Sequence, residues 1–257
     1  MKKVLLIISL LISTLTFCQI KVDLIGINQY KRDSIISIDS FTFKYYLNGN
    51  KLKKENKFTT FNYSNLKLGR VTKVEAFNAL KTLVLYRDTN TTVILDNRFA
   101  EIRIIDFNQL KDIKLVSHIS NANNNSFWVF NTIENRLELF DYNLSVTKAK
   151  TNPITSKIID ITSDYNYVWL LTETDVLCYN YAGSLIYKLQ NNNYKAIKNI
   201  NENLILQKEN VLYFYNKETE KLNLISLSHQ LINSFFVSQQ NLYICELNKL
   251  YTYQLNY

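Results

Sequence analysis

A unit of about forty residues recurs through most of the chain, and this repeat constrains the fold more than any other feature. Each copy contains an apolar run, a polar turn and a second, alternating run. Three copies place two aligned residues eleven positions apart: Trp169–Asn180, Ile205–Asn216 and Tyr243–Gln254. With two looser copies included, the aligned positions are Val84, Trp128, Trp169, Ile205 and Tyr243, at steps of 44, 41, 36 and 38 residues.

Each copy also supplies the remaining strands of a small sheet. Apolar alternation follows the polar corner at residues 102–105, 144–146, 185–187 and 222–225, and an apolar stretch at 158–161 precedes one tryptophan position. Alternation with a period of two is typical of half-buried strands. Four short strands in about forty residues make a unit the size of one propeller blade, and such units bury their faces by packing around a channel.

We therefore predict an all-β fold, a β-propeller of six four-stranded blades. The sixth copy is expected to begin at Phe41–Phe43 and to continue through a hairpin at Asn48-Gly49, because both turn residues accept a positive φ. The last copy reaches Tyr257 after three strands, so we predict that residues 20–25 close the ring as its fourth strand. A β-sandwich with chance internal similarity is the alternative, and the recurring spacing favours the propeller.

Residues 1–18 have the pattern of a signal peptide. Lys2 and Lys3 precede a mostly apolar run, and Thr16-Phe17-Cys18 places small residues where a signal peptidase requires them. We expect cleavage before Gln19 and export to the periplasm, to an outer-membrane-associated site or out of the cell. The run is too short for a permanent anchor, so no transmembrane segment is expected in the mature chain. The alternatives are an ordinary N-terminal strand, and lipidation at Cys18, which the bulky Phe17 disfavours.

The mature chain, residues 19–257, is expected to form a single domain, because no Pro-, Gly- or Ser-rich linker divides it. The full chain has four Gly and one Pro, so asparagine, which tolerates left-handed backbone conformations, is expected to replace glycine at some turns. Cys178 and Cys245 lie 67 residues apart in apolar runs. Export permits a disulfide, but a buried thiol acting as a small hydrophobe is the commoner arrangement and the one we predict.

The positive charge is concentrated in one segment. Residues 50–73 contain seven basic residues and one acid, a net formal charge of +6, whereas the rest of the mature chain sums to zero. The predicted partner-binding residues are Lys51, Lys53, Lys54, Lys57, Lys67, Arg70 and Lys73. Such a patch attracts an anionic surface or an acidic envelope protein; the alternative is a hairpin that lysines keep soluble. Aromatic neighbours suit single-stranded nucleic acid, but an exported protein rarely meets it, so no nucleic-acid partner is expected.

The corners between strands resemble those of a known class of repeat. The stretch Phe127–Val146 and the corner Asn180-Tyr181-Ala182-Gly183-Ser184-Leu185 resemble quinoprotein-like and related propeller repeats of bacteria. The resemblance covers about residues 40–257 and is one of repeat style, without the tryptophan-docking motifs of true quinoprotein blades. The signal ending and the Lys/Asn/Tyr-rich composition resemble exported proteins of flavobacterium-type organisms. The resemblance implies a fold and transfers no activity.

The sequence contains none of the common catalytic motifs, neither GxSxG, HExxH, P-loop nor GxGxxG, and no EF-hand loop. His118 and His229 lack acidic or Cys neighbours at ligand spacing. Acids recur at the predicted corners: Asp88, Asp96, Glu134, Asp141, Glu173 and Asp175. Two channel carboxylates could act as in a glycosidase, but such side chains also cap tight turns, the role we favour. We predict no catalytic, metal or cofactor site, and no cofactor.

These observations predict an exported, non-enzymatic propeller that acts as a monomeric protein-binding or assembly scaffold in the cell envelope. One alternative is a carbohydrate-active hydrolase with carboxylates in the channel. Another is a ligand-sensing or lectin-like propeller. The scaffold and the hydrolase differ in whether acids from several copies converge in space.

Overall fold

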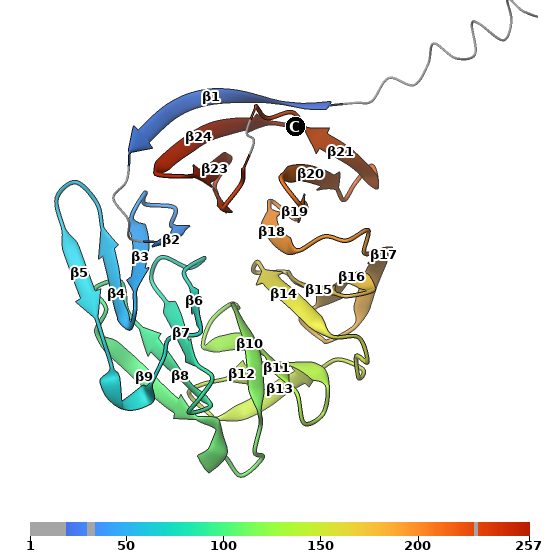
Figure 1. The fold of residues 1–257 in the computed structure, drawn as a ribbon. Coiled ribbons are helices and arrows are strands. Elements are labelled where there is room, and N and C mark those ends of the chain that lie inside the picture. Colours follow the sequence, from blue (N-terminus) through green and yellow to red (C-terminus); the bar gives the residue numbers. More distant parts are fainter. Residues whose placement is uncertain (1–18, 30–33, 229–230) are drawn as a thin grey trace, which may run out of the picture.

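The computed structural model describes residues 19–29, 34–228 and 231–257. The predicted signal peptide at 1–18, Cys18 and His229 lie outside these residues. Within them, 24 strands (β1–β24) and two short 3₁₀ helices (η1, η2) follow one another around a ring (Figure 1). No helix of this described part is long and apolar enough to cross a lipid bilayer.

Four sheets of the ring have four strands each, in sequence order. The first holds β2 (Ser34–Ile38), β3 (Lys44–Asn48), β4 (Lys51–Glu55) and β5 (Thr60–Tyr63). The second holds β6 (Lys73–Glu75), β7 (Thr82–Tyr86), β8 (Thr91–Leu95) and β9 (Glu101–Asp106). The third holds β10 (Val116–Asn121), β11 (Ser126–Asn131), β12 (Arg136–Asp141) and β13 (Val146–Lys150). The fourth holds β14 (Ile158–Ser163), β15 (Tyr167–Thr172), β16 (Asp175–Asn180) and β17 (Leu185–Gln190). The helices η1 (Leu66–Leu68) and η2 (Phe107–Gln109) lie in connections between sheets.

The fifth sheet has eight strands in two halves. One half is β18 (Ala196–Ile200), β19 (Asn203–Lys208), β20 (Val211–Asn216) and β21 (Lys221–Ile225); the other is β22 (Ser234–Ser238), β23 (Asn241–Glu246), β24 (Lys249–Asn256) and β1 (Gln19–Gln29). β1 pairs antiparallel with β24 along most of its length. The first two residues of β1 pair in parallel with β21, which joins the halves. The predicted closing role of residues 20–25 is therefore confirmed.

The repeat alignment coincides with the strand register. Each aligned position is the third residue of β7, β11, β15, β19 or β23, the second strand of its unit. The sixth copy is displaced from its predicted place: Phe41–Phe43 lies outside the strands, and β3 places Tyr46 at the aligned position. The strand predicted at 144–146 likewise begins only at Val146, because the preceding residues form the turn from β12.

The core lies between neighbouring sheets, because each sheet has two apolar faces. Trp128 and Trp169 are both fully buried. Trp128 packs with Val168 of the fourth sheet, and Trp169 packs with Ile197 of β18. The two rings therefore fill equivalent places between successive sheets, as the repeat predicts.

The two mature cysteines belong to this core. Cys178 on β16 and Cys245 on β23 are buried and are not joined in a disulfide, as predicted. Burial raises the pKa of the Cys178 thiol to about 12, so the thiol is protonated at neutral pH.

Several turns use non-glycine residues with positive φ. The asparagines among them are Asn90, Asn124, Asn135, Asn193 and Asn201, which confirms the expected substitution for glycine. Glu202, Glu209 and Leu247 also adopt positive φ, which the composition did not predict. Gly183 cannot be replaced in this way, because its φ is 81° and a Cβ there would collide with the Lys150 carbonyl group.

Antiparallel pairing sends alternate turns to opposite ends of the ring. We call face A the end with the turns from first to second and from third to fourth strands. Face B is the end with the turns from second to third strands and the connections between sheets. The first strands β2, β6, β10, β14, β18 and β22 surround the centre of the ring (Figure 1).

Candidate functional site

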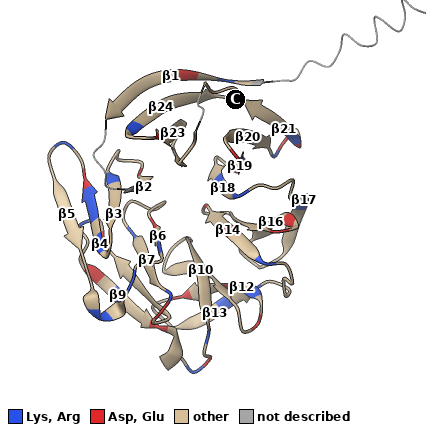
Figure 2. Ribbon diagram, in the orientation of Figure 1, with Lys and Arg blue, Asp and Glu red and all other residues tan. Residues whose placement is uncertain are grey.

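The structure separates the seven basic residues that were predicted to bind a partner. Lys57 lies in the β4–β5 turn on face A, whereas Lys51, Lys67 and Arg70 are exposed towards face B. Figure 2 shows Lys and Arg spread around the ring, with several on β4. The clustering in sequence therefore does not produce one patch in space.

Three of the seven have charged partners within the protein. Lys54 is buried, with its Nζ 3.2 Å from Asp39 Oδ2 and 4.7 Å from the centre of the Phe43 ring, so it cannot belong to a surface patch. Lys53 pairs with Glu55 at 2.6 Å. Lys73 pairs with an acid in the centre of the ring, as described below. Successive side chains of β4 point to opposite sides of the sheet, and Lys54 lies on the buried side. A count of charges along the sequence does not show this.

A small apolar groove opens on face A between the first and second sheets. Its volume is about 140 Å³, and it is lined by Phe41, Phe43, Lys54, Thr59, Phe61, Ala79, Leu80, Asn97 and Arg98. Phe41 and Leu80 are 63% and 62% exposed, and Phe58 in the adjoining turn is 92% exposed. Arg98 is part of the lining and is exposed, and Lys57 is exposed in the turn that also carries Thr59 of the lining. Large apolar side chains at such exposure favour a role in contact with another molecule.

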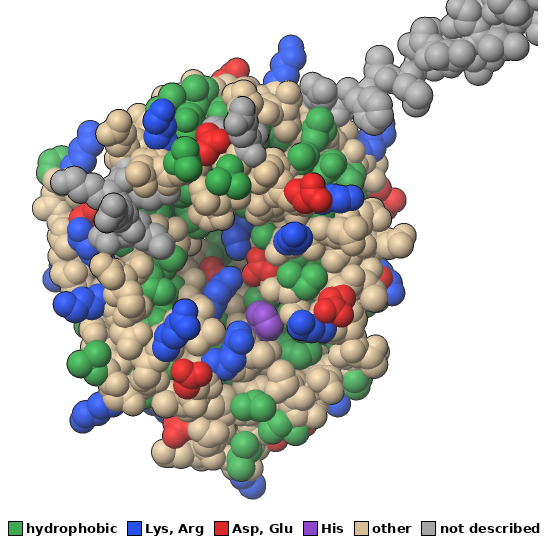
Figure 3. Space-filling model, in the orientation of Figure 1, with side chains coloured by type: hydrophobic (Ala, Val, Ile, Leu, Met, Phe, Trp, Pro, Cys, Tyr) green, Lys and Arg blue, Asp and Glu red, His purple; other side chains and the backbone are tan. Residues whose placement is uncertain are grey.

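A larger cavity of about 270 Å³ lies in the centre of the ring. Its lining comes from β2, β6, β18, β22 and the turns that follow them, with Thr162 of β14. Most of the polar lining is hydroxyl and amide side chains, with Lys73, Glu75, Lys198 and Asp39 as the charged groups. Figure 3 shows a hollow near the middle of one face, with Lys and Arg side chains around it.

Asp160 on β14 joins three sheets beside this cavity. Its Oδ1 lies 3.3 Å from Lys73 Nζ and its Oδ2 lies 3.5 Å from Lys198 Nζ. The backbone N–H groups of Ile161 and Ile197 also donate to it, at 3.0 and 3.3 Å. Burial alone would raise the pKa of Asp160, but the two lysines and the two N–H groups lower it to about 2. Both carboxylate oxygens are thus occupied.

Glu75, two residues after Lys73 on β6, has fewer direct polar partners than Asp160. The backbone N–H of Phe77 donates to its Oε1 at 3.4 Å, and no ion pair found among the described residues includes Glu75. Burial raises the pKa of this carboxyl, and Lys73 and Lys198 oppose that shift from farther away. Glu75 therefore presents to the cavity a carboxylate that makes no direct ion pair within the described residues.

His118 lies on β10 near the same charges. Its Nδ1 shares a hydrogen bond of 2.9 Å with the Ser117 hydroxyl. Burial, with Arg87 and Lys73 nearby, lowers the pKa of His118 to about 4, so the imidazole is neutral at pH 7. Within the described residues, no three His, Cys, Asp or Glu side chains come together as metal ligands would.

The acids predicted at the strand corners remain at the corners, and none of the six lines the central cavity. Asp96 Oδ1 accepts from the backbone N–H groups of Arg98 and Ala100, and Asp141 Oδ1 accepts from those of Asn143 and Leu144. Turn capping is confirmed for these two. Glu134, Glu173 and Asp175 pair with lysines at or near the protein surface. The two acids that come together near the cavity are instead Glu75 and Asp160, which lie on inner strands. Neither is at a strand corner, and neither was predicted from the sequence.

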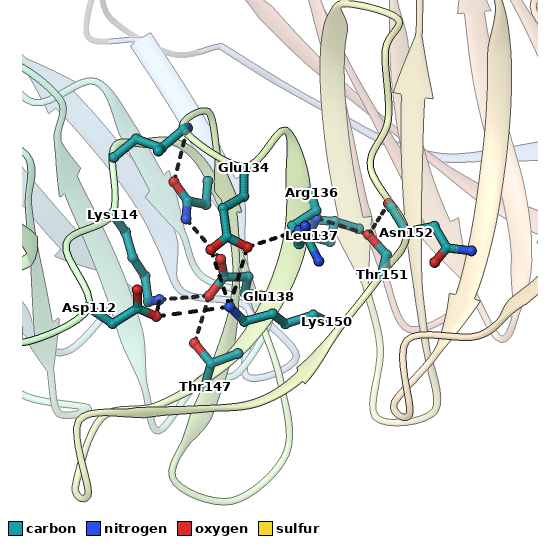
Figure 4. A network of polar contacts seen from close by, with 12 residues as sticks. Asp112, Lys114, Glu134, Arg136, Leu137, Glu138, Thr147, Lys150, Thr151 and Asn152 are labelled. Carbon is teal, nitrogen blue, oxygen red and sulfur yellow. Dashed lines mark hydrogen bonds and ion pairs between the residues drawn. The ribbon is translucent and has the colours of Figure 1, made fainter.

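A second charged group lies inside the third sheet (Figure 4). Lys114 and Glu138 are 1% and 0% exposed, and their Nζ and Oε2 atoms are 2.8 Å apart. Asn131 donates to Glu138 Oε1 at 2.8 Å, and Thr147 donates to Oε2 at 2.6 Å. Asp112, which is exposed, pairs with Lys114 at 2.6 Å. Every charged atom here has a partner, so the group is structural.

No protein-family model and no curated protein sequence matches this chain. Solved structures match its fold. Virginiamycin B lyase from Staphylococcus aureus superposes with a TM-score of 0.61 over 86% of this chain and 79% of that chain, at 12% identity. The WD40 β-propeller domain of Doa1 gives a TM-score of 0.61 over 86% and 78%, also at 12% identity.

A bacterial surface protein has the same fold over part of its length. PorZ, an essential surface component of the type-IX secretion system of Porphyromonas gingivalis, gives a TM-score of 0.56 at 13% identity. The match covers 88% of this chain and 32% of PorZ. Identities this low show the fold alone, and the fold is a β-propeller, as the repeat predicts.

Proposed function

We propose that this chain is an exported, non-enzymatic β-propeller that acts as a monomeric protein-binding scaffold in the cell envelope. Residues 1–18 are its signal peptide, and residues 19–257 are one domain. Counting the halves of the eight-stranded sheet as separate blades gives six blades. The face A groove carries the proposal, because it combines exposed aromatic side chains with a cationic rim.

The occupant that fits this groove is an acidic, extended segment of a partner protein. An apolar side chain of the partner would enter between Phe41 and Leu80, which line the groove. Its carboxylates would meet Lys57 and Arg98 at the rim. The nearby acids do not compete, since Glu55 pairs with Lys53 and Asp96 caps a turn. Aromatic and arginine side chains are enriched at the energetic centres of protein interfaces.

Two observations support an envelope scaffold, the first of them against a channel hydrolase. A glycosidase needs two carboxylates with free oxygens, whereas Asp160 uses both oxygens for lysines and backbone N–H groups. PorZ, a propeller-containing protein, is a bacterial surface component, which supports an envelope role for a chain of this fold. Anionic lipid is a weaker match, because the cations are divided between face A, face B and the interior.

The test is a comparison of charge reversals on the two faces. K57E/R98E should reduce recovery of partners from envelope membranes at least tenfold, since it inverts the charge at the groove. K51E/R70E, with the same change in net charge on face B, is the matched control and should leave recovery unchanged. Equal effects of the two variants would show that only net charge matters and would refute the groove as the docking site.

The apolar surface beside the groove has its own matched pair. F58S removes the ring that is 92% exposed on face A, and L66S removes a side chain that is 81% exposed on face B. F58S alone should weaken recovery of partners, with both variants melting close to the parent because surface changes alter stability by about 0.5 kcal/mol or less. Loss of recovery in L66S alone would place the docking surface on face B.

Export is tested separately by the intact mass of the protein recovered from the envelope. The expected species begins at Gln19. A diacylglycerol adduct on Cys18 would show lipidation instead, and an unprocessed chain starting at Met1 would refute the signal peptide.

A further inference from the structure

The central cavity supports an inference that does not depend on the face A groove. We propose that it binds a small zwitterion, an amino acid or a short peptide, whose carboxylate meets Lys73 and Lys198 and whose ammonium meets Glu75. The side chain of the ligand would lie against the apolar part of the lining.

The cationic end of the site is held in place by Asp160. Lys73 from β6 and Lys198 from β18 approach the same carboxylate from two sheets, at 3.3 and 3.5 Å. Their side chains remain 32% and 30% exposed within the ring. Each ammonium has three donors, so each keeps donors for a second acceptor. Two ammonium groups around one carboxylate leave one positive charge for a ligand anion.

The anionic end is Glu75. It lies two residues from Lys73 along β6, so both side chains project from the same side of the strand, about 7 Å apart along it. Lys73 and Lys198 attract the Glu75 carboxylate without pairing with it directly, so an ammonium of the ligand in direct contact would stabilise its ionised form further. The other cavity carboxylate, Asp39, already binds Lys54 and the Tyr45 hydroxyl at 3.2 and 3.0 Å, so it cannot substitute.

The remaining lining fits the rest of an amino acid. Hydroxyl and amide side chains such as Ser37, Ser238 and Asn199 supply hydrogen bonds, while Ile36 and Phe236 supply apolar surface. A volume of about 270 Å³ admits an amino acid or a short peptide. A simple anion would leave Glu75 without a direct ion pair, and a simple cation would leave the remaining donors of the two lysines unused. A zwitterion satisfies both ends.

The experiment is isothermal titration calorimetry of the purified mature chain with L-leucine and two analogues that each lack one of its charged groups. L-leucine carries both charges, 4-methylpentanoate carries only the carboxylate, and 3-methylbutylamine carries only the ammonium. L-leucine, or the dipeptide glycyl-leucine in its place, should bind at least about tenfold tighter than either singly charged analogue, which corresponds to about 1.4 kcal/mol.

Variants then assign the two ends. E75Q should weaken L-leucine at least tenfold without weakening 4-methylpentanoate, because only the ammonium loses its partner. K198M should weaken both. The matched controls E173Q and K157M alter an exposed pair on face B and should change neither affinity. Thermal melts confirm that each variant is folded before titration.

Three outcomes would overturn the proposal. The first is the absence of saturable binding of both L-leucine and glycyl-leucine to the folded parent. The second is 4-methylpentanoate binding as tightly as L-leucine, which would make the cavity a simple anion site. The third is an unchanged affinity of E75Q for L-leucine. The face A variant K57E/R98E should bind L-leucine normally, so failure here and failure of the scaffold proposal are distinguishable.

Discussion

Two groups of charges lie inside this propeller, and they differ in how completely they are paired. In the third sheet, Lys114 and Glu138 are buried and every charged atom has a partner. Around the central cavity, Asp160 is saturated by two lysines, whereas Glu75 makes one long backbone hydrogen bond and no direct ion pair within the described part of the chain. A buried charge is tolerated when it is paired and hydrogen-bonded. Complete pairing therefore marks a structural element, and the incomplete pairing of Glu75 marks a surface that can receive a ligand.

The largest effect is expected from breaking the complete group. E138A would leave Lys114 buried with only the exposed Asp112 as a partner. Removing one partner of a buried pair costs about 3–5 kcal/mol, and we expect the lower end because Asp112 remains. Urea unfolding of the parent and the variant measures this difference.

A double variant sharpens this result. K114M/E138L replaces both charges with apolar side chains of similar size, and such replacements are often neutral or stabilising. It should recover most of the stability that E138A loses. If the double variant is as unstable as E138A, the ion pair adds net stability to the folded protein, beyond offsetting the cost of burying its two charges.

Asp160 gives a smaller, pH-dependent effect. Its pKa is lowered to about 2 in the folded protein from 3.8, so its stabilisation is present above about pH 4 and is lost as the pH falls towards 2. The difference corresponds to about 2 kcal/mol. D160N should therefore be less stable than the parent by about this amount at pH 7, with the gap closing in acid. Unfolding curves at pH 7, 4 and 3 test the prediction, and a gap independent of pH would contradict it.

The fold was largely predictable because its signal is repeated. Trp128 and Trp169 are both the third residue of the second strand in successive sheets. Because every unit has an apolar residue at this position, the copies can be aligned from the sequence. The sixth copy was misplaced because Phe41 and Phe43 imitate the apolar alternation of a strand. In the structure, Asp39 Oδ1 accepts from the backbone N–H groups of both residues, so they form a turn.

The candidate sites were not predictable in the same way, because they depend on which side of a strand a residue faces and on contacts across the ring. Lys54 was assigned to a surface patch by charge counting, and the side of β4 on which it lies buries it. Lys73 and Asp160 lie 87 residues apart and meet only when the ring closes. A useful signal was available for Glu75, since it follows Lys73 by two residues on an inner strand.

The smallest effect is expected at Glu75, and its sign is opposite to that of Asp160. Because burial raises the pKa of Glu75, its ionised form destabilises the folded protein, and stability falls as the pH rises through the folded-state pKa. E75Q removes this penalty and should gain about 0.5–1 kcal/mol at pH 7, within the range of single stabilising changes. Saturating L-leucine should reverse the order, since ligand binding stabilises only the form that binds it. Melting curves of E75Q and the parent, with and without L-leucine, measure both stability differences. The control variant E173Q should melt like the parent in both conditions. If E75Q is destabilised without ligand, Glu75 has a structural partner in solution, and the contrast between complete and incomplete pairing no longer separates the two groups.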